Sequence, residues 1–176
     1  MKIFGICGSP RQNGNSQWAL SKLLEACEKN GHQTSTILLS TATIKLCDGS
    51  LTEEIGNKDF DDDMQIVKKG MLEADAIVFC SPTYFDNTTP HLKNLIDRTD
   101  PFYEELKGKA ALILVVGQAN DEGSRTAVVN YLKTYCEIAE MTVKGAAAFR
   151  AANKGDIQKI SGIDDKLSAL AQCLEV

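Results

Sequence analysis

The sequence KIFGICGSPRQNGNS, residues 2–16, decides the fold. Its first six residues are mostly apolar, as in a buried strand, and the Gly-Ser-Pro that follows breaks the strand. From about Ser16 the apolar residues recur at helical spacing, through Trp18, Leu20 and Leu23 to Ala26. The segment therefore predicts a strand, a loop and a helix in direct succession.

The same alternation continues along the chain. Four more strands are predicted at residues 34–39, 74–81, 109–116 and 142–149. Helical patterns end at Glu73, follow Pro90, and cover residues 122–139 and 157–174. Strands joined by helices pair in parallel through right-handed crossovers. We expect one α/β domain over residues 1–176, a doubly wound five-stranded parallel sheet of order 2-1-3-4-5 between two helical layers.

The strand order locates a ligand site. In a doubly wound sheet, ligands bind beyond the carboxyl ends of the strands where the order reverses, here at the first and third strands. The loops that meet there are residues 8–16, 82–90 and 117–123. We therefore look for binding residues in these loops.

The first loop, GSPRQNGNS, combines two glycines, short hydroxyl and amide side chains and one arginine. Backbone N–H groups at a helix start lack intrahelical acceptors and lie at the positive end of the helix dipole, so a phosphate accepts several bonds there. Ser9, Asn15 and Ser16 add side-chain donors, and Arg11 adds a charge-assisted one. The loop predicts a phosphate site; the alternative is that its serines and asparagines only cap the helix.

Competing phosphate motifs do not fit this loop. It has no GxGxxG, the signature of a Rossmann dinucleotide site, and Asn15 follows Gly14 where a P-loop needs lysine. Arg11 lies four positions after Cys7, which is too close for a CxxxxxR phosphatase.

The second loop lies in SPTYFDNTTP, residues 81–90, and places Tyr84 and Phe85 directly after a central strand. Aromatic rings there can stack on a flavin. Free backbone amides in this Pro-bounded turn can donate to the redox-active nitrogen of the flavin, which changes the relative stability of its oxidised and reduced forms. The alternative is that the two aromatics only cover the end of the sheet.

Through GSPRQNGNS and SPTYFDNTTPHLKNLIDR, which ends at Arg98, the sequence resembles the NAD(P)H-dependent FMN reductase and iron-sulfur flavoprotein group of the flavodoxin-like superfamily. The resemblance implies a flavodoxin-like fold that binds FMN. It implies phosphate contacts from Ser9, Arg11, Asn15, Ser16 and Gln17. It places Pro82, Thr83, Tyr84, Phe85, Asn87 and Gly117 along the flavin ring and the ribityl chain.

Two features depart from the pattern of that group. Its iron-sulfur members carry four cysteines in the loop after the second strand, whereas the polar segment 40–63 here contains only Cys47. Iron-sulfur clusters normally need four cysteine ligands, so we expect no cluster and no metal site. The third loop, GQAND from Gly117, also has fewer glycines than in many relatives.

The bulk composition excludes other classes of protein. A formal net charge of -5 without a basic cluster argues against nucleic acid as a partner. The longest apolar run, residues 110–116, is too short to span a membrane. Six cysteines lie scattered without a CxxC pair, which favours reduced and mostly buried thiols and a cytoplasmic location.

These patterns predict an FMN-dependent oxidoreductase that passes hydride from NADH or NADPH to FMN, and then electrons to a small acceptor such as a flavin or a quinone. Hydride transfer needs positioning rather than an acid or a base, so no catalytic side chain is expected. A flavodoxin-type electron carrier and a non-catalytic flavin-binding module stay open as alternatives. The resemblance implies a homodimer or homotetramer, and we expect Asp97 with Arg98 in a subunit contact or a surface ion pair.

Overall fold

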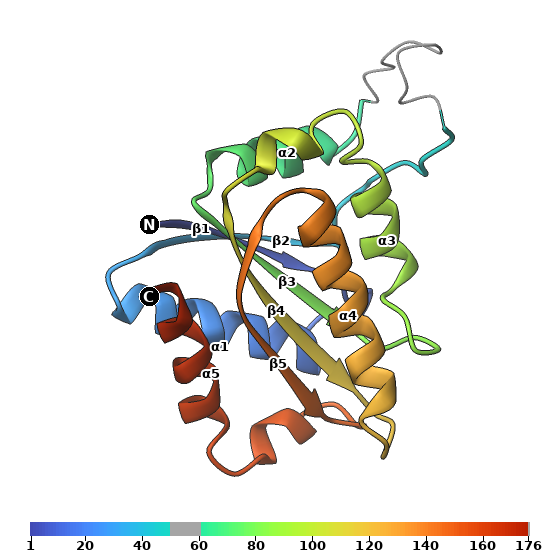
Figure 1. The fold of residues 1–176 in the computed structure, drawn as a ribbon. Helices are drawn as coiled ribbons and strands as arrows, with labels where there is room; N and C mark the ends of the chain where they lie inside the picture. The colour runs from blue at the N-terminus through green and yellow to red at the C-terminus, as the bar shows by residue number, and fades with distance from the viewer. Residues whose placement is uncertain (50–60, 176) are drawn as a thin grey trace.

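A five-stranded parallel sheet with the order β2-β1-β3-β4-β5 forms the centre of the protein (Figure 1). The computed structural model describes residues 1–49 and 61–175. The strands are β1 (Lys2–Cys7), β2 (Gln33–Leu38), β3 (Ala76–Pro82), β4 (Ala110–Gly117) and β5 (Thr142–Arg150). All neighbouring pairs are parallel. The predicted fold class and strand order are confirmed.

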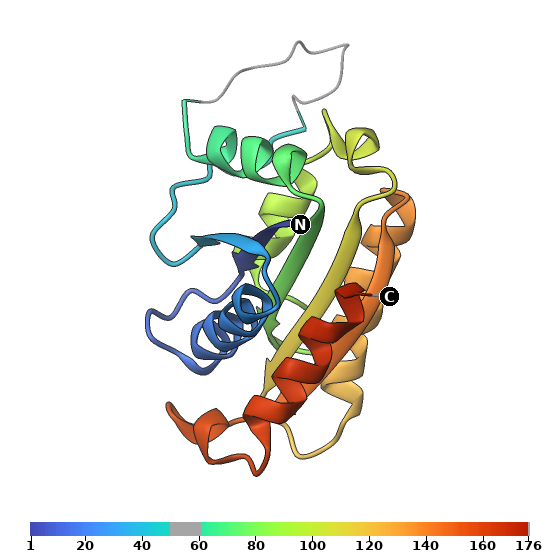
Figure 2. The ribbon, with the colours of Figure 1, turned by 90° about the vertical axis from the view of Figure 1, so that its left-hand side faces the viewer.

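Helices cover both faces of this sheet, as Figures 1 and 2 show. They are α1 (Asn15–Lys29), α2 (Met64–Glu73), α3 (Pro90–Asp97), α4 (Gly123–Ile138) and α5 (Ile163–Gln172). Buried side chains of α1 and α5 form one core with one face of the sheet, while those of α2, α3 and α4 form another with the opposite face. The sheet is thus the middle of three layers, with two separate cores.

The central strands are apolar throughout because both of their faces are covered. Every residue of β4 is buried, and so are the first six residues of β3. Their carboxyl ends lie next to that of β1, with Cys7 opposite Cys80 and Pro82 opposite Val116. This register brings the loops after β1, β3 and β4 to one edge of the sheet.

The predicted carboxyl-terminal helix, residues 157–174, is wrong in its extent. The chain instead forms a 3-10 turn (Asp156–Lys159), then α5, and then a second 3-10 turn (Cys173–Glu175). Gly162 separates the first turn from α5 with φ +66°, a left-handed conformation that ends regular helix. The apolar spacing from Ile157 to Leu174 persists across this break because all these segments pack against the same core.

The other predicted elements agree with the structure within about two residues at each end, the usual uncertainty of helix boundaries. The helix that ends at Glu73 begins at Met64, and the structure adds a 3-10 turn at Tyr103–Leu106. The polar loop predicted for residues 40–63 is observed at 40–49 and 61–63, and residues 50–60 lie outside the described part.

Candidate functional site

The loops after β1 and β3 are joined directly at the carboxyl edge of the sheet. The N–H of Gly8 donates to the carbonyl oxygen of Cys80 at 2.7 Å. The buried hydroxyl of Thr89 donates to the carbonyl oxygen of Gly8 at 2.6 Å and accepts from the N–H of Leu92 at 3.2 Å. One threonine therefore caps α3 and holds the two loops together.

The first turn of α1 leaves backbone donors without partners in the described part of the chain. The N-cap residue is Gly14, which has no side chain to cap the helix. Trp18 is the first residue whose N–H has a carbonyl acceptor, the oxygen of Gly14 at 3.0 Å. The N–H groups of Asn15, Ser16 and Gln17 therefore remain available at the positive end of the helix dipole.

Hydrogen bonds within the loop hold this arrangement in place. The Ser9 hydroxyl accepts from the N–H of Arg11 at 3.2 Å. The side-chain oxygen Oε1 of Gln17 accepts from the N–H of Asn13 at 2.6 Å, and Asn13 takes the left-handed conformation with φ +54°. These contacts are all made within the loop itself.

The remaining side chains predicted for phosphate differ in their surroundings. The side chain of Asn15 is engaged with the segment after β5: it donates to the carbonyl oxygen of Asn153 at 2.8 Å and accepts from the N–H of Gly155 at 2.9 Å. Ser16 is buried and Arg11 is exposed. Arg11 and Ser16 are therefore the two side chains in this loop best suited to meet an anion.

The loop after β3 forms a tight two-residue hairpin. Tyr84 and Asn87 exchange two backbone hydrogen bonds of 2.8 and 3.0 Å, while Phe85 and Asp86 have φ values of +47° and +59°. Glycine, asparagine and aspartate are usual in such turns, so Asp86 suits its position while Phe85 is strained. Phe85 is fully exposed and Tyr84 is partly so.

The expectation of free backbone amides in this loop is only partly correct. The N–H groups of Thr83, Tyr84, Asn87 and Thr88 all have acceptors. Those of Phe85 and Asp86 have none in the described part of the chain. Donors to a ring are therefore limited to the tip of the hairpin.

The base of the hairpin depends on residues that sequence reasoning did not single out. The buried hydroxyls of Ser81 and Thr88 lie 2.6 Å apart and share a hydrogen bond, beside the Thr89 contact described above. The signal was present in the sequence, since a threonine directly before a proline is typical of a helix start. Interpreting the segment from Tyr84 and Phe85 alone does not reveal this role of its threonines.

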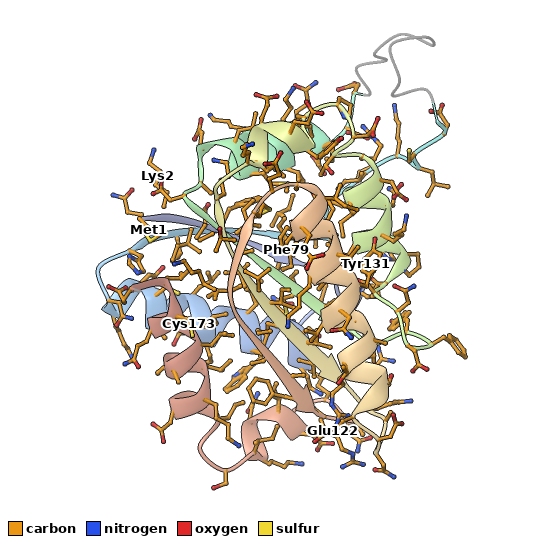
Figure 3. The ribbon with its side chains drawn as sticks, in the orientation of Figure 1. Met1, Lys2, Phe79, Glu122, Tyr131 and Cys173 are labelled. Carbon is orange, nitrogen blue, oxygen red and sulfur yellow. The ribbon has the colours of Figure 1, made fainter. Side chains whose placement is uncertain are left out.

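The loop after β4 approaches the hairpin at Gly117. A Cβ atom at this glycine would lie 2.7 Å from the Thr83 hydroxyl oxygen and 2.9 Å from Cγ of Arg125, so no larger residue fits without movement. Glu122, labelled in Figure 3, lies in this loop just before α4. The predicted site residues Thr83 and Gly117 are thus brought together by neighbouring strands.

The comparisons with known proteins agree with this geometry. The sequence profile of the NADPH-dependent FMN reductase family matches residues 1–156. The chain belongs to this family. The reductase is thus an FMN-dependent oxidoreductase.

The relatives of the reductase include flavoproteins. An iron-sulfur flavoprotein of Methanocaldococcus jannaschii is 34% identical over 148 residues, which are 82% of this chain and 76% of that protein. Another, of Methanosarcina thermophila, is 30% identical over 151 residues, which are 82% of this chain and 78% of that one. The structure of RosB with a bound formylated riboflavin phosphate intermediate superimposes with a TM-score of 0.75 and 18% identity, covering 99% of this chain and 80% of that one. This last likeness confirms the fold.

Residues 40–63 of the reductase contain one cysteine, Cys47, where the iron-sulfur members of the resembled group carry four. Its N–H donates to the Asn94 side chain at 2.8 Å. No group of three or more metal-ligating side chains occurs within residues 1–49 and 61–175. The absence of an iron-sulfur cluster stays a prediction from the sequence.

The predicted surface ion pair of Asp97 with Arg98 is wrong. Asp97 instead pairs with Lys93 on the exposed face of α3, one helical turn away. Arg98 is buried, and its guanidinium donates to Asp62 at 2.9 Å and to the carbonyl oxygen of Lys45 at 2.8 Å. Neighbours in sequence on a helix point in different directions, so adjacency did not imply contact.

The Arg98–Asp62 pair anchors the far end of α3. Burial by itself would raise the pKa of Asp62, but hydrogen bonds from Arg98 and from the N–H groups of Lys45 and Met64 outweigh it and lower that pKa. The carboxylate therefore stays charged at neutral pH. The segment around Lys45 is in this way fixed to the helix that follows the hairpin.

Four of the six cysteines are buried, as predicted. The neighbouring Cys7 thiol and burial raise the pKa of Cys80 well above its usual value. Burial raises the pKa of Cys27 to about 11 and that of Cys136 to about 12. The thiols of Cys27, Cys80 and Cys136 are therefore protonated at neutral pH and pack as small apolar groups.

No helix within the described residues is long and apolar enough to cross a membrane.

Proposed function

We propose that this reductase accepts hydride from NADH or NADPH on FMN and passes the electrons to a small acceptor such as a flavin or a quinone. The observation that carries the proposal is the uncapped start of α1, where three N–H groups have no acceptor in the described residues and Arg11 and Ser16 lie nearby. Helix starts of this kind bind phosphate. A dianionic phosphate ester such as that of FMN fits this donor set.

We assign the predicted residues to two parts of the cofactor. Ser9, Arg11, Asn15, Ser16 and Gln17 would hold the phosphate, with Asn15 acting through its backbone N–H because its side chain is engaged elsewhere. Pro82, Thr83, Tyr84, Phe85, Asn87 and Gly117 would line the ring and the ribityl chain. These contacts are proposals that rest on the positions of the loops.

The chain supplies position rather than proton transfer in this reaction. When bound, FMN supplies the centre that accepts hydride from the nicotinamide. The N–H groups of Phe85 and Asp86 at the hairpin tip are suited to orient the ring. No acid or base is needed, so we assign no catalytic side chain.

The full exposure of Phe85 supports an oligomer. An aromatic side chain held out by a strained turn gains nothing from contact with water, and its burial against a second copy would be favourable. We therefore propose a homodimer or homotetramer. A cytoplasmic location belongs to the same proposal and is supported by six free cysteines.

The phosphate assignment is tested by titrating the apoprotein with FMN and following flavin fluorescence. Arg11→Ala and Ser16→Ala each remove one donor to an anion, so each should weaken binding by about 1 to 3 kcal/mol. Arg150→Ala, an exposed arginine at the end of β5, is the matched control and should bind FMN like the wild type. Unchanged affinity in both loop variants would move the phosphate site elsewhere.

The reaction itself is tested by mixing the FMN-loaded protein with NADH or with NADPH without oxygen. Rapid loss of the flavin absorbance supports the reductase, and the faster nucleotide identifies the donor. Retention of the yellow colour with both nucleotides contradicts hydride transfer and favours an electron carrier or a flavin-binding module.

A further inference from the structure

Arg125 is a buried arginine without a carboxylate partner in the described part of the chain. It is only 6% exposed, and its Nη1 atom donates to the carbonyl oxygen of Ala119 at 2.6 Å. None of the ion pairs within residues 1–49 and 61–175 includes it. Its Nε and Nη2 atoms have no protein partner there, yet neither is fully enclosed. A buried charge of this kind is costly unless something negative accompanies it.

The place of Arg125 on its helix strengthens this argument. It is the third residue of α4, at the positive end of the helix dipole. The acidic residues Asp121 and Glu122 lie just before the helix, and Asp121 accepts from the N–H of Ser124, but within the described residues neither forms an ion pair with Arg125. A cation is disfavoured at that end, where aspartate and glutamate are usual. A residue that opposes its local electrostatics is expected at a functional site, where a ligand compensates for it.

The stem of Arg125 lies beside the loops after β3 and β4, at the carboxyl edge of the sheet. Its Cγ atom and the Thr83 hydroxyl both lie within 3 Å of the point where Gly117 would carry a Cβ atom. β3 separates β4 from β1, so the two outer strands are about 10 Å apart, two strand spacings. The available N–H groups of α1 follow β1. A phosphate there and a ring near Arg125 are therefore spaced for one mononucleotide with an extended sugar chain.

We propose that Arg125 contacts the pyrimidine edge of the flavin ring and stabilises the negative charge that this edge carries after reduction. The inference rests on the proposed function, because it requires FMN at this edge of the sheet. FMN carries negative charge on its phosphate and, after reduction, on its ring. The phosphate is assigned to α1, so the ring is the charged part left for the loop after β4. The N1 atom and its neighbouring carbonyl oxygen are therefore the part of the ring suited to the guanidinium.

The negative charge on the reduced flavin ring follows from the atoms and electrons that move in hydride transfer. A C–H bond of the reduced nicotinamide breaks, and its electron pair and hydrogen pass to the flavin, so the nicotinamide leaves in its oxidised form. The flavin keeps one extra negative charge, shared by N1 and the adjacent carbonyl oxygen. Arg125 transfers no proton, since its guanidinium stays charged at all relevant pH values, and it acts by attraction and hydrogen bonding alone.

The test is the midpoint potential of bound FMN, measured by titration against reference dyes. Arg125→Met keeps the apolar stem and removes the charge. It should weaken the binding of reduced FMN at least tenfold relative to oxidised FMN, which lowers the potential of this two-electron couple by about 30 mV. Arg125→Lys keeps the charge and should retain most of the wild-type potential.

The pH dependence of the potential gives a signature that a merely structural role would not produce. With Arg125 in place, reduction near neutral pH should take up one proton with two electrons, a change of about 30 mV per pH unit. Without the positive charge N1 holds its proton to higher pH, so the change should approach about 60 mV per pH unit in Arg125→Met.

Controls separate this inference from the proposed function. Arg150→Met removes an exposed arginine and should leave the potential unchanged. If the methionine variant does not fold, Arg125→Gln serves as a second neutral variant with the same expectation. A neutral variant that binds FMN with the wild-type potential, or a lysine variant that loses as much as the neutral ones, overturns the role of Arg125 alone. Failure of the wild type to bind FMN overturns the proposed function and this inference together.

Discussion

The loops after β1 and β3 lie side by side at the proposed FMN site, but they are ordered in different ways. The loop after β1 is held by its own hydrogen bonds, from Arg11 to Ser9 and from Asn13 to Gln17, and by Asn15 contacts to the segment after β5. The loop after β3 is held by the Ser81–Thr88 hydrogen bond at its base and by the two backbone bonds between Tyr84 and Asn87, while its tip at Phe85 is strained and exposed.

This difference teaches how the two parts of a mononucleotide site can be built. A phosphate has a fixed shape and charge, so donors that are already in place bind it without further ordering. A flavin ring must meet the nicotinamide and the acceptor in turn, and an open hairpin tip suits that exchange. The first loop depends on local contacts, whereas the second depends on the anchoring of α3.

The largest expected effect comes from removing the anchor of α3. Arg98→Met leaves the buried Asp62 carboxylate without its partner and should lower the free energy of unfolding by about 3 to 5 kcal/mol. Urea denaturation measures this loss. Lys93→Met, which removes the exposed pair with Asp97, is the matched control and should change stability by less than about 1 kcal/mol. Equal losses in the two variants would show that the buried pair is not an anchor.

A smaller effect is expected where the two loops touch. A Cβ atom at Gly8 would lie 2.8 Å from Cβ of Leu92 and 3.2 Å from the carbonyl oxygen of Cys80. Gly8→Ala should therefore cost about 1 to 3 kcal/mol, because backbone and helix must move apart. Gly14→Ala meets its nearest neighbours at 3.5 Å and should lose less than about 1 kcal/mol. Thermal denaturation of both variants measures the two losses of stability. A larger loss for Gly14→Ala than for Gly8→Ala would contradict the close contact of Gly8 with Leu92 and Cys80.

The smallest effect is expected at the hairpin tip, and its sign is opposite. Phe85→Gly removes an exposed ring from a position with φ +47° and should stabilise the protein by up to about 1 kcal/mol, since glycine takes this conformation freely. The same variant should weaken self-association, which sedimentation velocity measures. A stability loss would mean that Phe85 packs against something in solution, while unchanged association would remove it from the subunit interface.

Sequence reasoning worked best where local chemistry decides the structure. The strand ending at Cys7, the loop after it and the start of α1 follow from alternation, breakers and capping rules that act over a few residues. Sequence reasoning worked least well for residues whose interaction partners lie far away in the sequence. Asp62 and Arg98 are 36 positions apart, and nothing near either residue indicates their pairing. Arg125 was missed for the same reason, because its significance appears only when it is known to have no carboxylate partner within residues 1–49 and 61–175.

The amino-acid sequence by itself determined the order of strands and helices, the sheet topology and the loop that is suited to phosphate. Those features follow from periodicity and from backbone donors that every helix start leaves open. Only the tertiary structure decided that the side chain of Asn15 is engaged, that Phe85 faces solvent and that Arg125 is buried beside Thr83. Burial and partnership depend on which segments the fold brings together across the sheet, and the pattern of neighbouring residues does not contain that information.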